Sequence, residues 1–382
     1  MSGNPRRLCI VAGEESGDIY GAELAVALRA LAPETVVEGM GGSRMESAGV
    51  NIIVDSRNLG AMGIVEAHNK LGGIVRAYRR LSSHLAKTRY DAVVCIDFPE
   101  FNLRLARSAK RRGHRVIYYV TPQIWAWRRW RVQLLRKYAD LCLVVLPFEA
   151  DFYRARKVKA EFVGHPLLDL VKPAPDKAGF LHEVGLDPSR PVIGLLPGSR
   201  RAEIRYMLST LRKAAEKLSR ARPNLQFLLP VAPTVRRGQV EHYLDGHGLD
   251  LALVEGRAHD VMSSSDLCLI VSGTATLEAA ILGTPMVIIY QGSYFSGLVA
   301  KLLLRIPSFG LPNIVAGRTI VPELSQKEVS PEAIAREALS ILDEPVVRQT
   351  MVAELDKVRS LLGDGGATER AARRILEFLV VS

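Results

Sequence analysis

The sequence predicts an α/β protein made of two Rossmann-like, doubly wound domains in tandem. Its 382 residues exceed what one ordinary hydrophobic core holds, so two domains are the first expectation. Through the first half, short runs rich in Val, Ile, Leu and Cys alternate with helix-like stretches, as in a parallel sheet with crossover helices. The same alternation restarts at residue 191.

Nine apolar runs predict buried strands. They span residues 8–13, 91–98, 115–120 and 141–146, then 191–199, 225–231, 251–256, 267–273 and 285–290. Helical spacing predicts helices at 18–31 and 103–113, and through the tail at 331–363 and 366–381. The Pro-rich stretch 164–180 is the expected linker. We therefore expect one domain over 1–170, a second over 171–345, and C-terminal helices over 346–382.

Composition and residue spacing predict the cellular compartment and whether a metal or cofactor is bound. The four cysteines have no CxxC pairing and lie in apolar runs, which favours buried thiols in a reducing cytosol. No secretory leader precedes the first strand, and the least charged stretch, 279–300, is interrupted by polar residues, so we expect no membrane span. No His, Cys or Asp cluster has metal-ligand spacing, so we expect neither a metal nor a cofactor.

Positive charge is concentrated in the first half. The net charge is +11, and residues 70–137 alone hold 17 Lys and Arg against three Asp and Glu. Such one-sided charge indicates a polyanionic partner: a nucleic acid, an anionic membrane or phosphorylated substrates. Composition does not choose among these three.

Two loops of the first half carry candidate chemistry. Gly13 and Gly17 allow a tight turn after the first strand, where Ser16 and Asp18 can cap the following helix. Asp97 comes directly after the strand at 91–98, where a carboxylate can accept a proton from a substrate hydroxyl. A helix cap or a salt bridge is an equally good interpretation of Asp97 from the residues alone.

Two further segments suit a membrane interface or an acyl chain. Trp125, Trp127 and Trp130 lie among arginines, a combination that also suits nucleic acid. The stretch 62–81 places Leu71, Ile74 and Val75 among basic residues at helical spacing, as in an interfacial amphipathic helix. The alternative for both is an aromatic or aliphatic core face beneath a solvated basic face.

Two turns of the second half suit a phosphate. Gly198, Ser199 and Arg200 follow one strand, and Ser272, Gly273 and Thr274 follow another and open a helix. Backbone N–H groups at such a helix start, with a nearby cation, bind anions. Glu278 comes one turn later and could reach ribose hydroxyls. Capped loops without a ligand are the alternative.

Eight motifs then occur in an order that resembles the lipid-A-disaccharide synthase family. They are AGEESGD, IDFPEFN, YYVTPQIWAWR, GHPLLD, LPGSR, SGTATLE, LPN and VPEL. The resemblance implies a B-type glycosyltransferase, with two domains facing across a cleft and terminal helices returning to the first. It implies that UDP-2,3-diacylglucosamine donates its sugar to 2,3-diacylglucosamine 1-phosphate, which gives lipid A disaccharide 1-phosphate and UDP.

The resemblance also implies roles for particular residues. Asp97 matches the general base, with Ser16 facing the cleft, and Arg200 matches the residue expected near the donor diphosphate. The turn 272–274 with Glu278 matches the nucleotide-holding segment, and Asn313 matches a polar residue near the donor. The first domain would face the acceptor and the anionic inner face of the inner membrane, with no nucleic acid bound. The tail could pack on its own chain or join a homodimer.

Two other classes remain open. One is a related UDP-N-acetylglucosamine-using enzyme, such as the peptidoglycan N-acetylglucosaminyltransferase or a UDP-sugar epimerase. IDFPEFN and QIWAWR argue against both. The other is a nonenzymatic basic module that binds membrane or nucleic acid, which would not need two phosphate-compatible turns at separate strand ends.

Overall fold

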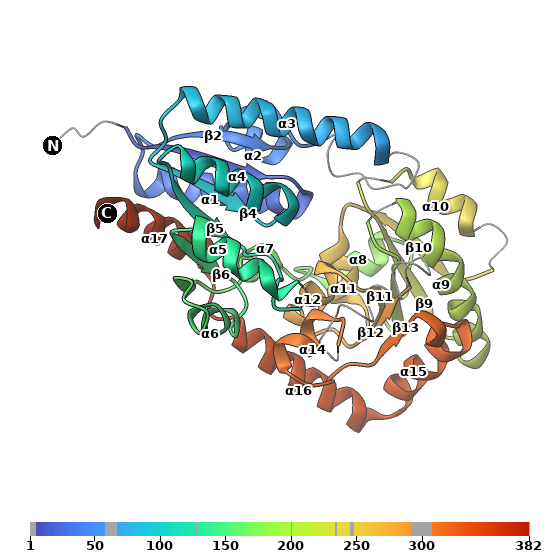
Figure 1. Cartoon of the computed structure of the whole chain (residues 1–382). Helices are drawn as coiled ribbons and strands as arrows, with labels where there is room; N and C mark the ends of the chain where they lie inside the picture. The colour runs from blue at the N-terminus through green and yellow to red at the C-terminus, as the bar shows by residue number, and fades with distance from the viewer. Residues whose placement is uncertain are drawn as a thin grey trace. The chain divides into compact units, whose positions relative to one another are not determined.

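The computed structural model describes residues 5–57, 67–126, 128–199, 201–233, 235–244, 248–291 and 308–381. The chain forms two compact units (Figure 1). The first unit comprises Met1–Leu168 and Leu362–Ser382, and the second comprises Asp169–Leu361. The chain thus leaves the first unit inside the Pro-rich stretch and returns to it near residue 362. Within the described residues, no helix has the length and apolarity needed to cross a membrane.

The first unit is built on a parallel sheet of seven strands in the order β3-β2-β1-β4-β5-β6-β7. The strands are β1 (Arg7–Ala12), β2 (Val36–Gly41), β3 (Asn51–Asp55), β4 (Ala92–Ile96), β5 (Arg115–Tyr119), β6 (Leu141–Val144) and β7 (Ala160–Phe162). The helices are α1 (Glu15–Leu31), α2 (Ser43–Ser47), α3 (Ala67–Lys87), α4 (Pro99–Arg111), η2 (Arg129–Arg131), α5 (Val132–Tyr138), α6 (Glu149–Arg154), α7 (Leu167–Leu170) and α17 (Ala367–Val381), of which α7 ends two residues into the second unit.

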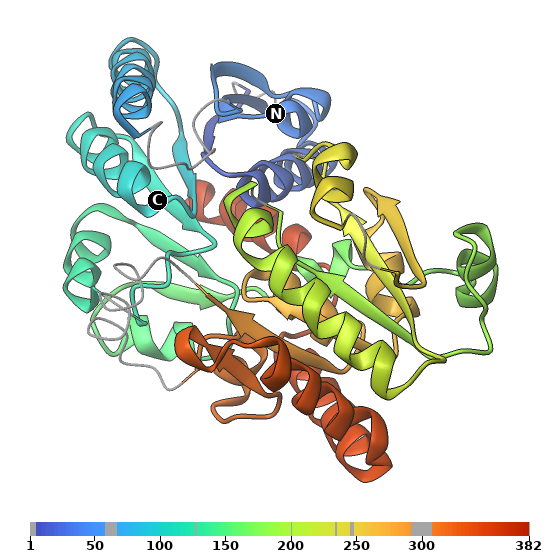
Figure 2. The ribbon, with the colours of Figure 1, turned by 90° about the vertical axis from the view of Figure 1, so that its right-hand side faces the viewer.

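Alternating side chains place two helical layers on this sheet. Cys9, Val93 and Tyr118 point to one face and share a buried cluster with Leu81 of α3 and Leu105 of α4. α3, α4 and α5 contact one another in series on that face, along one side of the unit (Figure 2). α1 packs against α17, so the last helix of the chain completes the first unit.

The second unit repeats the plan with a parallel sheet of six strands in the order β10-β9-β8-β11-β12-β13. The strands are β8 (Val192–Leu196), β9 (Gln226–Val231), β10 (Leu251–Glu255), β11 (Leu267–Val271), β12 (Met286–Tyr290) and β13 (Glu323–Ser325). The helices are α8 (Lys177–Glu183), α9 (Arg201–Ala221), α10 (Arg237–Leu244), α11 (Ala258–Ser264), α12 (Thr274–Ile281), α14 (Leu311–Ala316), η3 (Gln326–Glu328), α15 (Pro331–Asp343) and α16 (Pro345–Leu361).

The predicted fold class is confirmed, because both sheets have the doubly wound strand order and helical crossovers. The two last helices differ in where they pack. α16 contacts α12, α14 and α15 of the second unit, whereas α17 packs in the first. Arg374 of α17 fixes this return through two bonds to the carboxylate of Glu161, and the Thr368 hydroxyl lies 3.4 Å from that of Tyr119.

Candidate functional site

Each sheet has one point where the strand order reverses, and the predicted catalytic and phosphate-binding turns lie at these two points. In the first unit the neighbours are β1 and β4, which pair from Leu8↔Ala92 to Ala12↔Ile96. In the second unit they are β8 and β11, which pair up to Leu196↔Ile270. In open α/β sheets, ligands bind just beyond the carboxyl ends of these central strands. The four turns singled out in the sequence follow these four strands.

Asp97, directly after β4, is a half-buried carboxylate with a raised pKa. Burial, with a contribution from the charge of Glu14, raises the pKa of Asp97 to about 7. Glu14 ends the turn after β1, so the two loops act on one another electrostatically. They also touch, because a Cβ atom at Gly13 would lie 2.1 Å from the ring of Phe98. A carboxylate that titrates near neutral pH is suited to act as a general base.

The backbone around Asp97 is strained. Asp97, Phe98 and Val120 have φ angles of 41°, 47° and 55°, in the left-handed region. Asp enters this region more readily than most residues, whereas Phe and Val rarely do. The Asp97 N–H donates to the carbonyl of Val120. This hydrogen bond links the loop after β4 to the loop after β5. Such strain costs about 1–3 kcal/mol per residue and clusters at functional sites.

Two side chains behind the strand ends fix this backbone. The fully buried Asn102 donates from Nδ2 to the carbonyls of Ile96 and Asp97, at 3.0 and 2.9 Å. The Tyr118 hydroxyl donates to the same Asp97 carbonyl at 2.9 Å. Asp97 thus has its backbone fixed by side chains, and the residue as a whole is only partly exposed.

Glu100, three residues after Asp97, has a different environment. It pairs with Arg128 and Arg131, each at 2.6 Å. Partial burial opposes ionisation, but the hydrogen bonds and charges of the two arginines hold the pKa of Glu100 below its usual value. Of these two carboxylates, Asp97 is therefore the one poised to exchange a proton.

The turn after β1 differs from the sequence-based expectation. α1 starts at Glu15, so Ser16 and Asp18 both lie in its first turn, and the side chain of its N-cap residue, Glu14, makes no capping hydrogen bond. Asp18 instead accepts hydrogen bonds from the N–H groups of Gly42, Arg44 and Met45, and so caps α2. The expectation that Ser16 and Asp18 cap the first helix is wrong, because the orphan N–H groups of α2 are within reach of Asp18.

The tryptophans fall into separate environments. Trp125 is 4% exposed, and its indole N–H donates at 2.9 Å to Glu149, a buried carboxylate whose pKa burial raises to about 7. Trp125 is therefore part of the core, and its expected role facing a membrane or acyl chain is wrong. Trp130 is 64% exposed, and Trp127 lies outside the described residues. Sequence reasoning missed Glu149, which shows no local motif.

The helix expected at 62–81 is observed as α3 over Ala67–Lys87, and residues 62–66 lie outside the described part. Ile74 packs partly buried against the core cluster and so contributes to the core, and its expected membrane-facing role stays a prediction. Val75 is 43% exposed, and the side chain of Leu71 lies outside the described part. The apolar stripe of α3 thus chiefly serves the core, with Leu81 and Leu85 at its centre.

In the second unit, the turn after β8 requires glycine at position 198. Gly198 has φ +99°, and a Cβ there would lie 2.3 Å from the carboxylate of Glu203. Glu203, in the first turn of α9, accepts the Ser199 N–H at 3.1 Å. Arg200 lies outside the described residues, so its position near a diphosphate stays a prediction.

The turn after β11 exposes a helix start. Gly273 and Thr274 are exposed, and no described atom lies within 4 Å of a Cβ placed at Gly273. Ser272 is anchored by its N–H to Ile289 and by its hydroxyl to the Phe309 carbonyl. Within the described part of the chain, the side of Gly273 at the start of α12 is therefore uncovered, which suits an anion at the N-terminus of this helix. Glu278, one turn on, lies 3.5 Å from His259.

Asn313 has a structural role. It is 1% exposed, its Nδ2 donates to the Val321 carbonyl and to Glu323, and its Oδ1 accepts the N–H groups of Ile320 and Val321. These four bonds use the whole capacity of the amide. Asn313 thereby holds Glu323, which anchors the N–H groups of Phe309 and Gly310. Its expected contact with the donor stays a prediction.

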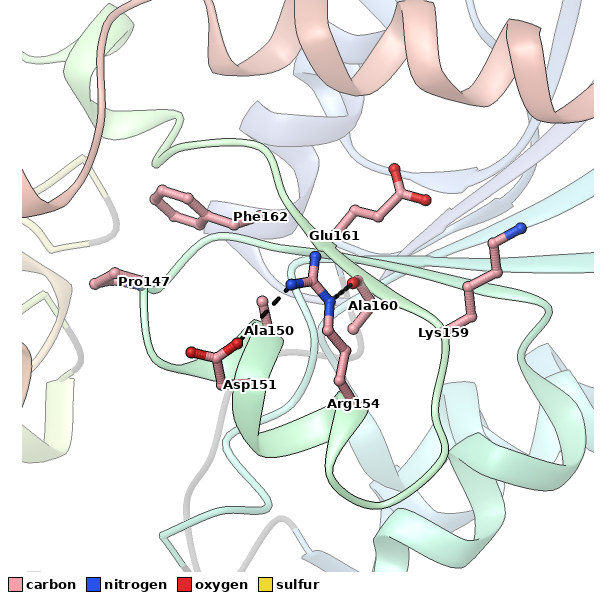
Figure 3. Close-up of a pocket in the computed structure, with 8 residues that line it drawn as sticks. All are labelled: Pro147, Ala150, Asp151, Arg154, Lys159, Ala160, Glu161 and Phe162. Carbon is pink, nitrogen blue, oxygen red and sulfur yellow. Dashed lines mark hydrogen bonds and ion pairs between the residues drawn. The ribbon is translucent and has the colours of Figure 1, made fainter.

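The pocket drawn in Figure 3 is separate from Asp97, which follows β4 of the same sheet. It is an open hollow of about 760 Å³ on the first unit, lined by α6 and the edge strand β7, three strands from β4. Its Arg154 bonds to the Ala160 carbonyl and faces Asp151. Across the described ranges, no three His, Cys, Asp or Glu side chains gather as a metal site.

Comparisons with known proteins agree with this arrangement. The family model for lipid-A-disaccharide synthetase matches residues 8–373. A lipid-A-disaccharide synthase of Myxococcus xanthus is 42% identical over 377 residues, 98% of each chain.

Two solved structures share the fold. The UDP-N-acetylglucosamine 2-epimerase of Neisseria meningitidis, bound to UDP-N-acetylglucosamine, has a TM-score of 0.67 at 14% identity, covering 98% of this chain and 100% of its own. The calicheamicin glycosyltransferase CalG4 has a TM-score of 0.62 at 16% identity, covering 99% of each. At such identities these two likenesses show the fold alone. Family match and close relative together place the chain in the lipid-A-disaccharide synthase family, and it is a glycosyltransferase of lipid A synthesis.

Proposed function

We propose that this glycosyltransferase transfers the sugar of UDP-2,3-diacylglucosamine to the hydroxyl of 2,3-diacylglucosamine 1-phosphate with inversion. The observation that carries the proposal is Asp97, a carboxylate with a pKa near 7 on a strained turn at the reversal point of its sheet. Asp97 would take the proton from the acceptor hydroxyl as that oxygen attacks the donor sugar. Ser16, in the first turn of α1, would line the same acceptor side.

The second unit would bind the donor. Gly198 and Ser199 after β8, and Ser272, Gly273 and Thr274 after β11, would surround the diphosphate with N–H groups, and Arg200 would supply a cation. Fixed donors and a cation directed at the leaving diphosphate stabilise its developing charge, usually the largest catalytic term. Glu278 would accept the ribose hydroxyls. This arrangement neutralises UDP without a metal ion.

The direct experiment is to incubate the purified chain with both acylated glucosamines and to measure UDP release with and without EDTA. We expect release that needs both substrates and is unchanged by EDTA. Release that requires only the donor would indicate hydrolysis of the donor. Loss of release in EDTA would contradict the metal-free mechanism.

We propose that an anionic membrane surface, and not nucleic acid, is the partner of the basic face of the first unit. The exposed basic residues of α3, α4 and α5 are Arg76, Arg79, Arg80, Lys87, Arg104, Arg107, Arg111, Arg136 and Lys137. Trp130 is exposed just before α5, and Val75 on α3. Each basic residue near an anionic leaflet contributes about 1 kcal/mol. This face would hold the enzyme at the inner face of the inner membrane, where its acylated substrates reside.

Salt tests this surface. Sedimentation with vesicles containing anionic lipid should show binding that falls steeply with added salt and is absent for neutral vesicles. Binding that survives high salt, or stronger binding to RNA than to vesicles, would contradict the proposal.

We also propose that a homodimer through the C-terminal segment would use the exposed face of α17, where Val380 is 69% exposed. The molar mass of the purified chain, measured by light scattering, tests whether this dimer forms.

A further inference from the structure

His259 and Glu278 join the helices that follow β10 and β11 in the second unit. His259 Nε2 lies 3.5 Å from Glu278 Oε2, with side chains 33% and 20% exposed. In the described part of the chain, no other side chain lies within ion-pair or hydrogen-bond distance of this carboxylate. Both side chains are thus partly shielded and keep part of their surface exposed.

The two helices are fixed relative to one another. α11 contacts α12, and the buried Thr284, just after α12, donates its hydroxyl to the Met262 carbonyl of α11 at 3.0 Å. The first turn of α11 is also fixed, because Arg257 bonds at 2.6 Å to both Asp260 and Glu183. His259 has no part in those bonds, so its approach to Glu278 is a separate feature of the turn.

We infer that His259 is a positioning residue that orients the Glu278 carboxylate toward the ribose hydroxyls of a uridine diphosphate. At 3.5 Å the imidazole N–H is beyond a short hydrogen bond, so it orients Oε2 electrostatically and leaves Oε1 able to accept a hydroxyl. This inference rests on the proposed donor site at the start of α12. It adds a residue of α11 that acts through Glu278 and not on the reacting atoms.

Calorimetric binding of UDP and of 2′,3′-dideoxyuridine 5′-diphosphate to the full chain tests the inference, because only UDP carries the hydroxyls. We expect the wild type to prefer UDP by roughly tenfold or more, the effect of hydrogen bonds to a charged group. His259→Ala should reduce that preference to about threefold, since coupled neighbours share part of their energy. His259→Gln, which keeps an N–H donor, should restore most of it.

Two controls sharpen the result. His242→Ala removes an exposed imidazole from α10 in the same unit and should leave the preference unchanged. In a Glu278→Ala background, which has no side-chain oxygen for His259 to orient, His259→Ala should change the preference no further.

The outcomes separate the two proposals. A wild type that does not bind UDP would overturn the donor site itself. Binding with an intact preference in His259→Ala would overturn only the positioning role. Equal weakening of both nucleotides in His259→Ala would also overturn it, because His259 would then contact the base or the diphosphate directly.

Discussion

The two units have the same sheet plan but different chemistry at the point where the strand order reverses. In the first unit the turns hold acidic groups, Asp97 beside Glu14, on a backbone where Asp97, Phe98 and Val120 have positive φ. In the second unit the corresponding turns use Gly198 and Gly273, and the start of α12 is exposed.

This difference indicates a division of labour on one fold. Six non-glycine residues of the described part have positive φ, and four of them (97, 98, 120 and 128) lie in loops after β4 and β5 of the first unit. Non-glycine strain fixes one carboxylate in place, which suits proton transfer. Glycine turns allow close approach of a ligand to backbone N–H groups, which suits diphosphate binding.

The largest expected effect is on proton transfer. Asp97→Asn should lower kcat by about 10²–10⁴, the range for losing a general base. It should change the UDP dissociation constant by less than about twofold, as expected if Asp97 does not contact the nucleotide and the two effects are independent. Steady-state UDP release and calorimetry measure the two quantities. Asp151→Asn, at an exposed carboxylate of the same unit, is the matched control. If Asp97→Asn lost UDP binding together with turnover, the two units would not have separate roles in proton transfer and UDP binding.

The next effect concerns the donor side. Arg200→Ala should lower turnover by about 10²–10³ and weaken UDP, because a cation at the leaving diphosphate is lost. Arg205→Ala, at an exposed arginine one turn into α9, should leave both quantities near wild type. Normal UDP affinity with reduced vesicle binding in Arg200→Ala would instead place that arginine on the acceptor side.

A third prediction separates structural residues from ligand-binding ones. Asn313→Ala leaves Glu323 and the N–H groups of Ile320 and Val321 without this partner. Each buried polar group left unpaired costs about 1–3 kcal/mol, so denaturant unfolding should show a clear loss of stability. UDP affinity of the folded fraction should stay within about twofold if the effect is structural. If Asn313→Ala had wild-type stability but did not bind UDP, Asn313 would be a donor-binding residue.

The smallest effect is a shift in pH dependence. Burial and then the charge of Glu14 raise the pKa of Asp97, so Glu14→Gln should lower that pKa. A base must be deprotonated, so kcat/KM rises with pH through this pKa, and the acidic limb should move to lower pH in the variant. Rates well above pH 7 should match the wild type. If the acidic limb of the kcat/KM profile stayed in place or moved to higher pH in Glu14→Gln, a group other than Asp97 would control it.

The sequence was sufficient to predict the strand ends and therefore the turns at both reversal points, because buried parallel strands appear as unbroken apolar runs. It could not predict partners that are distant along the chain. Trp125 is buried where its indole N–H donates to Glu149, and Asp18 caps a helix that begins 25 residues later. The amide of Asn313 forms its hydrogen bonds with residues 320–323. Each of these side chains also suits a ligand, and only packing distinguishes the two roles.

Amide hydrogen exchange of the full chain with and without UDP tests the division of labour most directly. We predict added protection at residues 197–199 and 272–275 of the second unit, with little change at 13–16 and 97–102 of the first. Protection confined to the 13–16 and 97–102 loops, with both turns of the second unit unchanged, would contradict the account.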